Sequence, residues 1–368
     1  MNGASRMPGL DGLRAFSILL VLLGHLRGTQ GFGSGQVFVG MGDIAHLGVE
    51  IFFVISGFLI TSLLLDEQEG TGRISLARFY VRRSLRIFPA FFAYLGALYC
   101  AHALGWIHLS TADLLTASTY TVNYHLDRSW YVGHIWSLSV EEQFYILWPM
   151  AMVIVATRRG RILLAVAVLL LAPLVRIAMH VAIKSGPARD LEIFPAVSDP
   201  IAAGCVMALA RERLLRHQWY RRITESGWVW LTLVPVLVIN KFDNYTIVNA
   251  LGSPLQLAIL ASLIEASTRR HRGPMAKVLN WAPVVFVGTL SYSLYLWQQP
   301  FLNRQCSTIY CSYPLNLALA IAFALASHLL LERPLIRLRK RFSSFPESID
   351  RSNRLNQTAA AERFPSKP

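Results

Sequence analysis

The sequence predicts an all-helical protein that crosses a membrane many times, and three observations support this fold class. The 368 residues are 54% hydrophobic and 15% charged, with a mean hydropathy of +0.43, whereas soluble domains carry roughly 25% charged residues. Apolar stretches of about 17 to 25 residues recur, each long enough to cross a ~30 Å hydrocarbon layer. Basic residues gather in alternate loops. We therefore expect a polytopic bundle of about ten transmembrane helices, with both termini in the cytoplasm.

The expected spans follow one another along almost the whole chain. In order, they are residues 13–32, 47–65, 85–104, 138–156, 162–180, 194–210, 227–240, 247–266, 282–300 and 313–332. The sixth and seventh are short and contain Pro195, Pro200 and Pro235. Because proline removes a helix hydrogen bond, we expect breaks in these two spans.

The basic residues indicate how the spans are oriented, because Lys and Arg collect in cytoplasmic loops. With the N-terminus inside, the outer loops hold only Arg27, Arg128, Lys184, Arg189, Lys241 and Arg304, and two further arginines, Arg14 and Arg176, fall within spans. The remaining Lys and Arg side chains lie on the cytoplasmic side. The net charge of +14 is thus explained by topology and by contact with anionic lipid. No nucleic-acid module is recognisable, so the expected partner is the bilayer and not a nucleic acid.

The domain organisation is simple. Residues 1–341 form one integral membrane domain, and no cleavage site follows the first apolar run, so we expect that span to be retained. Residues 342–368 are polar and rich in Ser, Pro, Asn and charge. Such a segment cannot bury enough apolar surface to offset its ordering entropy, and we expect a disordered cytoplasmic tail.

Arg14 and His25 are the strongest pointers to chemistry, because ionisable side chains within a span normally face a bundle interior or a wet cavity. They are eleven positions apart in the first span. At 100° per residue they leave the same face of a helix, about 16 Å apart along its axis. One titratable group is therefore expected near each membrane surface.

The second span begins with Glu50, at the outer level where His25 lies. This carboxylate could orient and charge-stabilise the imidazole, or it could be an interfacial residue solvated by headgroups. Ser56 and Gly57, further along the span, would let a substrate chain approach the backbone closely. Helix packing explains them equally well.

Arg83 and Arg86 open the third segment, three residues apart on one helix face at the cytoplasmic surface. Their forked guanidinium groups could grip the phosphates of a cytosolic ligand. Ordinary positive-inside anchoring is the alternative. Arg14 is expected at the same depth, which favours an anion site built from three arginines.

A long outer stretch of about 33 residues precedes the fourth span, and loops of that length usually carry function. It leads into Trp136, Glu141 and Glu142. Aromatic faces with adjacent carboxylates suit hydroxyl-rich ligands, although aromatic residues also mark membrane interfaces. Adjacent glutamates point to different helix faces, so we expect one of them, Glu141, to face a central cavity.

The ninth and tenth spans carry further polar side chains. Tyr292, Tyr295 and Gln299 fall on one stripe that could line a polar channel or be a packed stripe with satisfied hydroxyl groups. His328 and Glu332 are spaced for an ion pair near the inner surface.

The four cysteines allow few conclusions. Cys306 and Cys311 share an outer loop, where either a small bridge or two free thiols is consistent with the spacing. Cys100 and Cys205 lie in apolar surroundings and are interpreted as inert buried thiols.

In these motifs the chain resembles the membrane-bound acyltransferase 3 family, which O-acylates surface carbohydrates in bacteria. The resemblance extends to about residue 341. It rests on six motifs in order, which are Leu10-Asp11-Gly12-Leu13-Arg14 with His25, the run 52–61, the run 82–89, the run 136–145, the run 291–297, and Glu332-Arg333-Pro334. Glu50 stands where the family often has Asp, and Gln298 where it often has His. The second departure argues against proton transfer at that position.

The resemblance implies a donor and an acceptor on opposite sides of a bacterial inner membrane. The donor is an acyl-coenzyme A, with acetyl-CoA as the first candidate, and the acceptor is a carbohydrate hydroxyl at or beyond the outer leaflet. His25, oriented by Glu50 or Asp43, would act as general base. Arg14, Arg83 and Arg86 would hold donor phosphates or offset oxyanion charge.

Further site residues complete this hypothesis. Glu141 is the other expected catalytic carboxylate, and the expected substrate contacts are Ser56, Gly57, Trp136, Glu142, Tyr292 and Tyr295. No metal is expected. The alternative is a proton-coupled transporter of a glycan or lipid, which would have internally repeated halves, and we see no such repeat.

Overall fold

The computed structural model describes residues 9–32, 44–183, 192–239, 244–269 and 273–335. Asp43 and the expected tail at 342–368 lie outside the described residues. Within the described ranges every regular element is helical and no strand occurs, which confirms the all-helical prediction.

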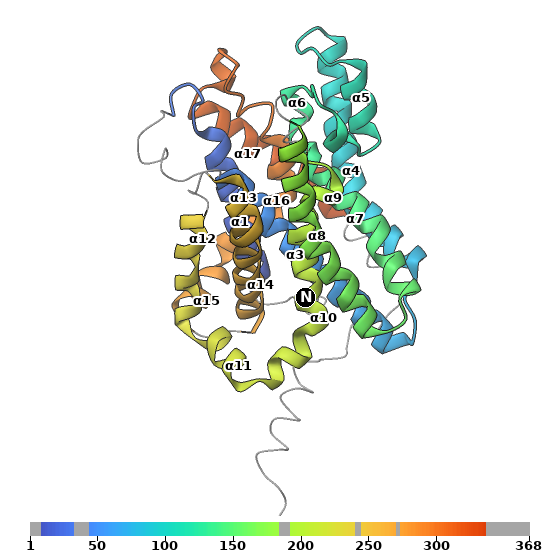
Figure 1. The fold of residues 1–368 in the computed structure, drawn as a ribbon. Coiled ribbons are helices and arrows are strands. Elements are labelled where there is room, and N and C mark those ends of the chain that lie inside the picture. The colour runs from blue at the N-terminus through green and yellow to red at the C-terminus, as the bar shows by residue number, and fades with distance from the viewer. Residues whose placement is uncertain (1–8, 33–43, 184–191, 240–243, 270–272, 336–368) are drawn as a thin grey trace, which may run out of the picture.

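The elements are arranged along the bundle as Figure 1 shows. In chain order they are α1 (Leu10–Leu26), α3 (Ile44–Thr71), α4 (Leu76–Ala103), α5 (Thr111–Ser118), η1 (Val122–Tyr124), α6 (Trp130–Gly133), α7 (Ile135–Ile154), α8 (Arg158–Ala182), α9 (Phe194–Val197), α10 (Asp199–Arg216), α11 (Gln218–Glu225), η3 (Gly227–Thr232), α12 (Leu233–Ile239), α13 (Tyr245–Ile247), η4 (Val248–Gly252), α14 (Ser253–Arg269), α15 (Pro274–Leu279), α16 (Ala282–Trp297), η5 (Ile309–Cys311), α17 (Leu315–Ser327) and η6 (His328–Glu332).

Five helical segments of the described chain are long and apolar enough to cross a membrane. They are Ile44–Thr71, Leu76–Ala103, Arg158–Ala182, Tyr245–Arg269 and Leu315–Leu335. A sixth is obtained if Gln218–Glu225 and Gly227–Ile239, which meet at a 76° bend, form one broken span. The protein is therefore an integral, multi-pass membrane protein, with five to six apolar spans supported where about ten were predicted.

Several predicted spans are shorter than expected for local reasons. The first ends at Leu26, because Gly28 and Gly31 adopt left-handed φ values of 82° that a helix cannot continue through. The sixth is divided at Ser198, between α9 and α10. The seventh starts as a 3₁₀ helix before α12. The proline-containing spans thus carry the expected breaks.

At two glycines in the centre of the bundle, the backbones of neighbouring helices are so close that no side chain would fit between them. A Cβ atom on Gly288 of α16 would lie 1.8 Å from the carbonyl oxygen of Asp11 on α1. A Cβ atom on Gly57 of α3 would lie 2.0 Å from the carbonyl oxygen of Ile201 on α10. Small residues let helix backbones approach closely in membranes, so α1 and α3 lie at the middle of the packing.

The bundle has two chemically different ends, with α5 and α6 at one and α11 at the other (Figure 1). We call the first the disulfide end, because the Cys306–Cys311 bridge lies there. We call the second the basic end. It contains the ion pairs Arg82–Glu67, Arg158–Glu212 and Arg211–Glu265, at 3.1, 2.6 and 2.8 Å.

The structure distinguishes between a bridge and two free thiols at Cys306 and Cys311. Cys306 and Cys311 are bridged, with their Cα atoms 6.0 Å apart. Cys205 is buried as predicted. Cys100 is exposed, so the prediction of a buried thiol was wrong there, because its side chain lies on the outer surface of α4.

Candidate functional site

A charged cluster forms where α1, α3, α4 and α7 meet. Ser56 Oγ donates a hydrogen bond to Glu141 Oε1, and Tyr145 Oη donates to Ser56 Oγ at 3.3 Å. The charge of Glu141 interacts electrostatically with three guanidinium groups. We call the set Arg14, Arg83, Arg86 and Glu141 the arginine cluster. The structure thus brings together four residues that the sequence singled out on three separate helices.

The guanidinium groups of Arg14 and Arg83 have hydrogen-bonding capacity left over. Arg14 Nη1 forms an ion pair with Asp11 Oδ1 at 3.9 Å. Arg83 stacks its Cζ atom 4.2 Å above the ring of Tyr145. Its buried Nε atom has no hydrogen-bond partner among the described residues. Because a buried donor without a partner is costly, this geometry suits an anionic ligand.

His25 lies at the other end of α1. Its Nδ1 atom lies within hydrogen-bond distance of Gln298 Oε1, at 2.8 Å. Its ring meets that of Trp130 edge-on, with centroids 5.8 Å apart. Gln298 is fully buried, while His25 is only half-buried. We call His25, Gln298, Gln299 and Trp130 the histidine cluster.

Glu50 is held by a set of partners that the sequence did not suggest. Gln256 Nε2 donates to Glu50 Oε2, and His46 Nδ1 lies 3.8 Å from Glu50 Oε1. The same carboxylate interacts electrostatically with Arg176 and Asp199. The described contacts of Glu50 therefore face α14 and α10, whereas those of His25 face α16 and α6. Asp43, the other residue expected to orient His25, lies outside the described residues.

Trp136 and Gly57 take different positions within the bundle. Trp136 stacks on the ring of His46, with centroids 6.2 Å apart, and meets Phe53 edge-on. Gly57 packs directly on the backbone of α10, which is the helix-packing alternative for this residue. Trp136 therefore stays a candidate for substrate contact, and Gly57 does not enter the proposal below.

The two tyrosines of α16 donate their hydroxyl protons to the backbone of neighbouring helices. Tyr292 Oη donates to the carbonyl oxygen of Ile87 at 3.0 Å. Tyr295 Oη donates to the carbonyl oxygen of His134 at 3.0 Å. Glu142 lies near enough to Tyr292 and Arg83 to interact electrostatically with both. The stripe on α16 is thus a packed one with satisfied hydroxyl groups.

The remaining expected pair and several unexpected residues complete the polar interior. His328 Nδ1 lies 3.4 Å from Glu332 Oε2, as expected for an ion pair. Sequence reasoning missed Gln256 and the Arg176–Asp199 pair, although a polar side chain inside an apolar span was a signal for both. It also missed His134, which is buried with neither ring nitrogen hydrogen-bonded among the described residues.

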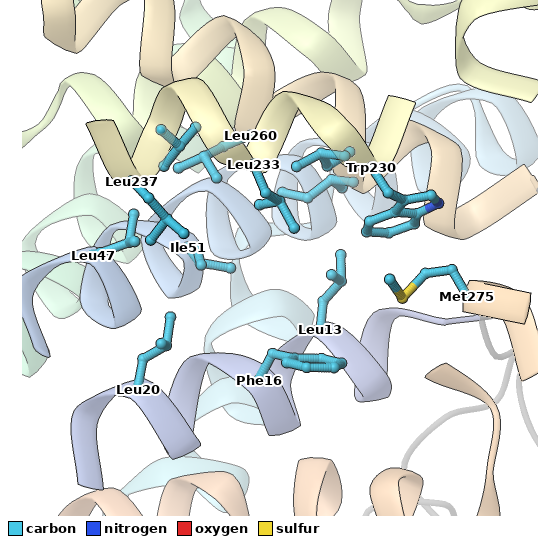
Figure 2. A pocket seen from close by; sticks show the side chains of 13 residues that line it. Leu13, Phe16, Leu20, Leu47, Ile51, Trp230, Leu233, Leu237, Leu260 and Met275 are labelled. Atoms are coloured by element: carbon cyan, nitrogen blue, oxygen red, sulfur yellow. The ribbon is translucent and has the colours of Figure 1, made fainter. Parts of the chain in front are cut away.

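An apolar cavity of about 230 Å³ lies on another side of α1 (Figure 2). Its walls come from α1, η3, α12, α14 and neighbouring segments, and the lining side chains include Leu13, Phe16, Leu20, Trp230 and Leu260. At 100° per residue, its three α1 residues point roughly opposite to Arg14 and His25. The cavity therefore belongs to the lipid-like part of the interior and not to the polar clusters.

No group of three or more His, Cys, Asp and Glu side chains arranged to hold a metal ion occurs in the ranges that the structure describes. The arginine cluster and the histidine cluster are instead built from arginine, glutamate, glutamine, tryptophan and one histidine. Such side chains suit ligand binding and proton transfer.

Comparison with known proteins identifies the family. The family model described as an acyltransferase domain, Acyl_transf_3, matches residues 7–331. The chain belongs to this family. It therefore carries an acyltransferase domain over most of its length. This assignment favours the enzyme over the transporter hypothesis.

The relatives include proteins of Bacillus subtilis, Staphylococcus aureus and Listeria monocytogenes. The chain is 29% identical to a Bacillus subtilis protein provisionally named peptidoglycan O-acetyltransferase YrhL, over 80% of this chain and 48% of that protein. It is 29% identical to a Staphylococcus aureus protein provisionally named an O-acetyltransferase, over 89% and 57%. It is 24% identical to the Listeria monocytogenes peptidoglycan O-acetyltransferase OatA, over 89% and 54%.

The chain spans about half the length of the curated relatives that it matches. No solved structure matches it. The family match covers nearly all the described helices of this chain.

Proposed function

We propose that this membrane acyltransferase moves an acyl group, with acetyl as the first candidate, from acyl-CoA to a carbohydrate hydroxyl. One observation carries the proposal. A single helix, α1, places Arg14 in the arginine cluster and His25 in the histidine cluster, eleven residues apart. This separation of about 16 Å is comparable to the length of a pantetheine arm. The names of the relatives support peptidoglycan or a similar glycan as the acceptor.

The arginine cluster is the proposed donor site. Arg14 and Arg83 have guanidinium N–H groups available for phosphate oxygens, and guanidinium forks bind phosphates through paired hydrogen bonds. Arg86 adds a third positive charge. Glu141 accepts from Ser56 and interacts with the same arginines, so we assign it the role of holding them in place. The basic end is then the cytoplasmic side, as the positive-inside rule predicts.

His25 is the proposed general base. It takes the proton of the acceptor hydroxyl while the oxygen attacks the thioester carbonyl. The new ester C–O bond forms as the C–S bond breaks, and the proton passes from His25 to the departing thiolate. Arg14, about 16 Å from His25 along α1, acts together with Arg83 on the donor phosphates and not on the reacting carbonyl. Trp136 and Glu142 are proposed acceptor contacts, while Glu50 supports the outer part of the site through His46.

The test uses purified protein in liposomes, with labelled acetyl-CoA and soluble peptidoglycan fragments or other glycans as acceptors. Label should appear as an ester on the glycan. Removing a general base costs about 10²- to 10⁴-fold in rate, so His25→Ala should reduce kcat by that factor. Arg213, an exposed residue at the basic end outside the arginine cluster, supplies the control, and Arg213→Gln should transfer label at the wild-type rate.

A second test of the same proposal is the face of the membrane from which the donor is used. In vesicles with one orientation, transfer should occur only when the donor is supplied to the face that carries the basic end. Transfer that continues in His25→Ala, or that is equally fast from both faces, would contradict the assigned roles.

A further inference from the structure

The hydrogen bonds next to His25 form a chain that starts at a backbone carbonyl. The carbonyl oxygen of Trp130 accepts from Gln299 Nε2 at 2.8 Å. Gln298 Nε2 donates to Gln299 Oε1 at 3.0 Å. Gln298 Oε1 then faces His25 Nδ1 at 2.8 Å. Three side chains from α1 and from the end of α16 are thus linked to a main-chain atom at the start of α6.

The carbonyl oxygen of Trp130 determines which atoms donate and which accept along this series of hydrogen bonds. A carbonyl oxygen can only accept hydrogen bonds, so the amide nitrogen of Gln299 must face Trp130. The oxygen of Gln299 is then left for Gln298, whose own nitrogen must turn toward it. That leaves the oxygen of Gln298 facing His25, and an amide oxygen carries no proton.

His25 must therefore donate from Nδ1. In a neutral imidazole one ring nitrogen carries the proton and the other carries the lone pair. We propose that Gln298 and Gln299 are positioning residues that hold His25 in its Nδ1–H tautomer and make Nε2 the basic atom. This inference rests on the proposed function, in which His25 is the general base.

Burial makes the arrangement rigid. Gln298 is fully buried and Gln299 is 3% exposed. Trp130 Nε1 also donates to the backbone oxygen of Gln299 at 2.8 Å, so residues 130 and 299 are joined by two hydrogen bonds in opposite directions. Turning either amide over would place two NH₂ groups or two oxygens against each other where water cannot compensate.

The ring of Trp130 adds a steric constraint to the hydrogen-bond chain. It meets the imidazole edge-on at 5.8 Å, so the same residue limits the ring position of His25 and anchors the amides. His25 itself is half-buried. The neighbours thus fix the tautomer of a side chain that still reaches a partly open space.

The experiment reads the tautomer directly by solid-state nuclear magnetic resonance on protein in liposomes, labelled with ¹⁵N-histidine. The His25 signals are those lost in His25→Ala. In the wild type at neutral pH, Nδ1 should have the chemical shift of a protonated nitrogen and Nε2 that of an unprotonated one. In Gln299→Leu, Gln298 Nε2 keeps only its long hydrogen bond to the carbonyl oxygen of Tyr295, at 3.5 Å, so Gln298 can turn over and both tautomers should appear.

A rescue variant separates orientation from general structural damage. A carboxylate accepts at both oxygens and needs no neighbour to orient it, so Gln298→Glu combined with Gln299→Leu should restore the Nδ1–H form. In the acyl-transfer assay, kcat of Gln299→Leu should fall about tenfold, because one neutral hydrogen bond sets the tautomer balance. The KM for acyl-CoA should not change, and the double variant should recover most of kcat.

Gln68, which accepts from Arg161 at the basic end, supplies the matched control, and Gln68→Leu should leave the His25 signals unchanged. A wild-type His25 protonated at Nε2, or a Gln299→Leu variant that keeps the Nδ1–H form alone, would overturn the inference. A wild type with the Nδ1–H form but without acyl transfer would support the tautomer assignment and contradict the proposed function.

Discussion

Arg14 and Arg176 are equally shielded from solvent but differ in what surrounds them. Their side chains are 21% and 17% exposed. Arg176 donates to Asp199 Oδ1 and Oδ2 at 2.6 and 2.8 Å and to Asn249 Oδ1 at 2.6 Å, and it also reaches the carbonyl oxygen of Ala196 and Ser253 Oγ. Arg14 has one ion pair, with Asp11 at 3.9 Å, among the described contacts.

This difference separates a structural charge from a functional one. A guanidinium group has five N–H donors, and those of Arg176 are used to join α8 to α10, η4 and α14. Its charge is neutralised by its own protein. Arg14 and Arg83 instead lie near each other as like charges, and Arg83 Nε has no hydrogen-bond partner among the described residues. This arrangement becomes favourable when an anion binds. Hydrogen-bond saturation therefore indicates which buried arginine serves the fold and which serves a ligand.

The largest effect is expected from breaking the saturated pair. Arg176→Met would leave Asp199, which is 1% exposed, as an unpaired buried charge, and this should cost about 3–5 kcal/mol in stability. Thermal unfolding in detergent should show the loss. The double variant Arg176→Met with Asp199→Leu should regain most of it, because no unpaired charge remains. If the single variant were as stable as the double variant, Arg176 would not be needed to neutralise Asp199, and its assignment as a structural charge would be wrong.

For the arginine cluster we expect a loss of donor binding with little loss of stability. Arg14→Gln removes charge-assisted hydrogen bonds to the donor, each worth about 1.5–3 kcal/mol, so the KM for acyl-CoA should rise about ten- to a hundredfold. Its ion pair with Asp11 is long and partly exposed, and such pairs contribute at most about 1 kcal/mol. Unfolding should therefore change little. The two readouts are acetyl-transfer kinetics and thermal unfolding of the same preparation.

Wild-type kinetics with a large loss of stability in Arg14→Gln would contradict this assignment. Lys277, an exposed cation on α15, provides the control at the basic end. The variant Lys277→Gln should leave both measurements unchanged, because its charge lies outside the arginine cluster.

The sequence was sufficient to predict what depends on helical periodicity. The eleven-residue spacing predicted that Arg14 and His25 share a face. The described contacts of Arg14 lie on α4 and α7, and those of His25 lie on α6 and just after α16. Arg14, Arg83 and Glu141 were predicted as polar intrusions into apolar segments, and the structure brings them together. Periodicity fixes the direction of a side chain on its own helix, which is why these predictions needed no tertiary information.

The sequence was not sufficient where the result depends on how two helices meet. Glu50 was predicted at the depth of His25, but it lies deeper in the bundle, because Gly48 on the same helix already packs against Ser17 and Val21 of α1. Its side chain is hydrogen-bonded to Gln256 on α14. The role of Gln299 depends on the backbone of Trp130, which is distant in the chain. Gly57 could be substrate contact or helix contact until α10 was placed against it. Short polar helices between spans also made the span count uncertain from hydropathy alone.

Carboxylates can also have all or only some of their hydrogen bonds formed. The smallest effect that we predict concerns a carboxylate whose hydrogen bonds are formed. Asp113 is 3% exposed in α5, outside the membrane-spanning segments. It accepts from Ser110 N and Ser129 N, both at 2.9 Å, and from Ser110 Oγ at 2.8 Å. His125 Nε2 lies 3.2 Å from it. Asp113 is thus the carboxylate counterpart of Arg176.

Burial raises the pKa of Asp113, but the hydrogen bonds from Ser129 and Ser110 outweigh it and hold the pKa below its ordinary value. A carboxyl group with a lowered folded pKa contributes stability above its unfolded pKa, about 3.9, and loses it as the pH falls through the folded value. Wild-type unfolding should therefore become easier below about pH 4. Asp113→Asn should be less stable than the wild type at neutral pH by about 1 kcal/mol, the usual cost of a lost cap. The difference in stability between the wild type and Asp113→Asn should become smaller as the pH falls. A difference that stays constant from neutral to acid pH would show that the charge of Asp113 does not stabilise the α5 segment.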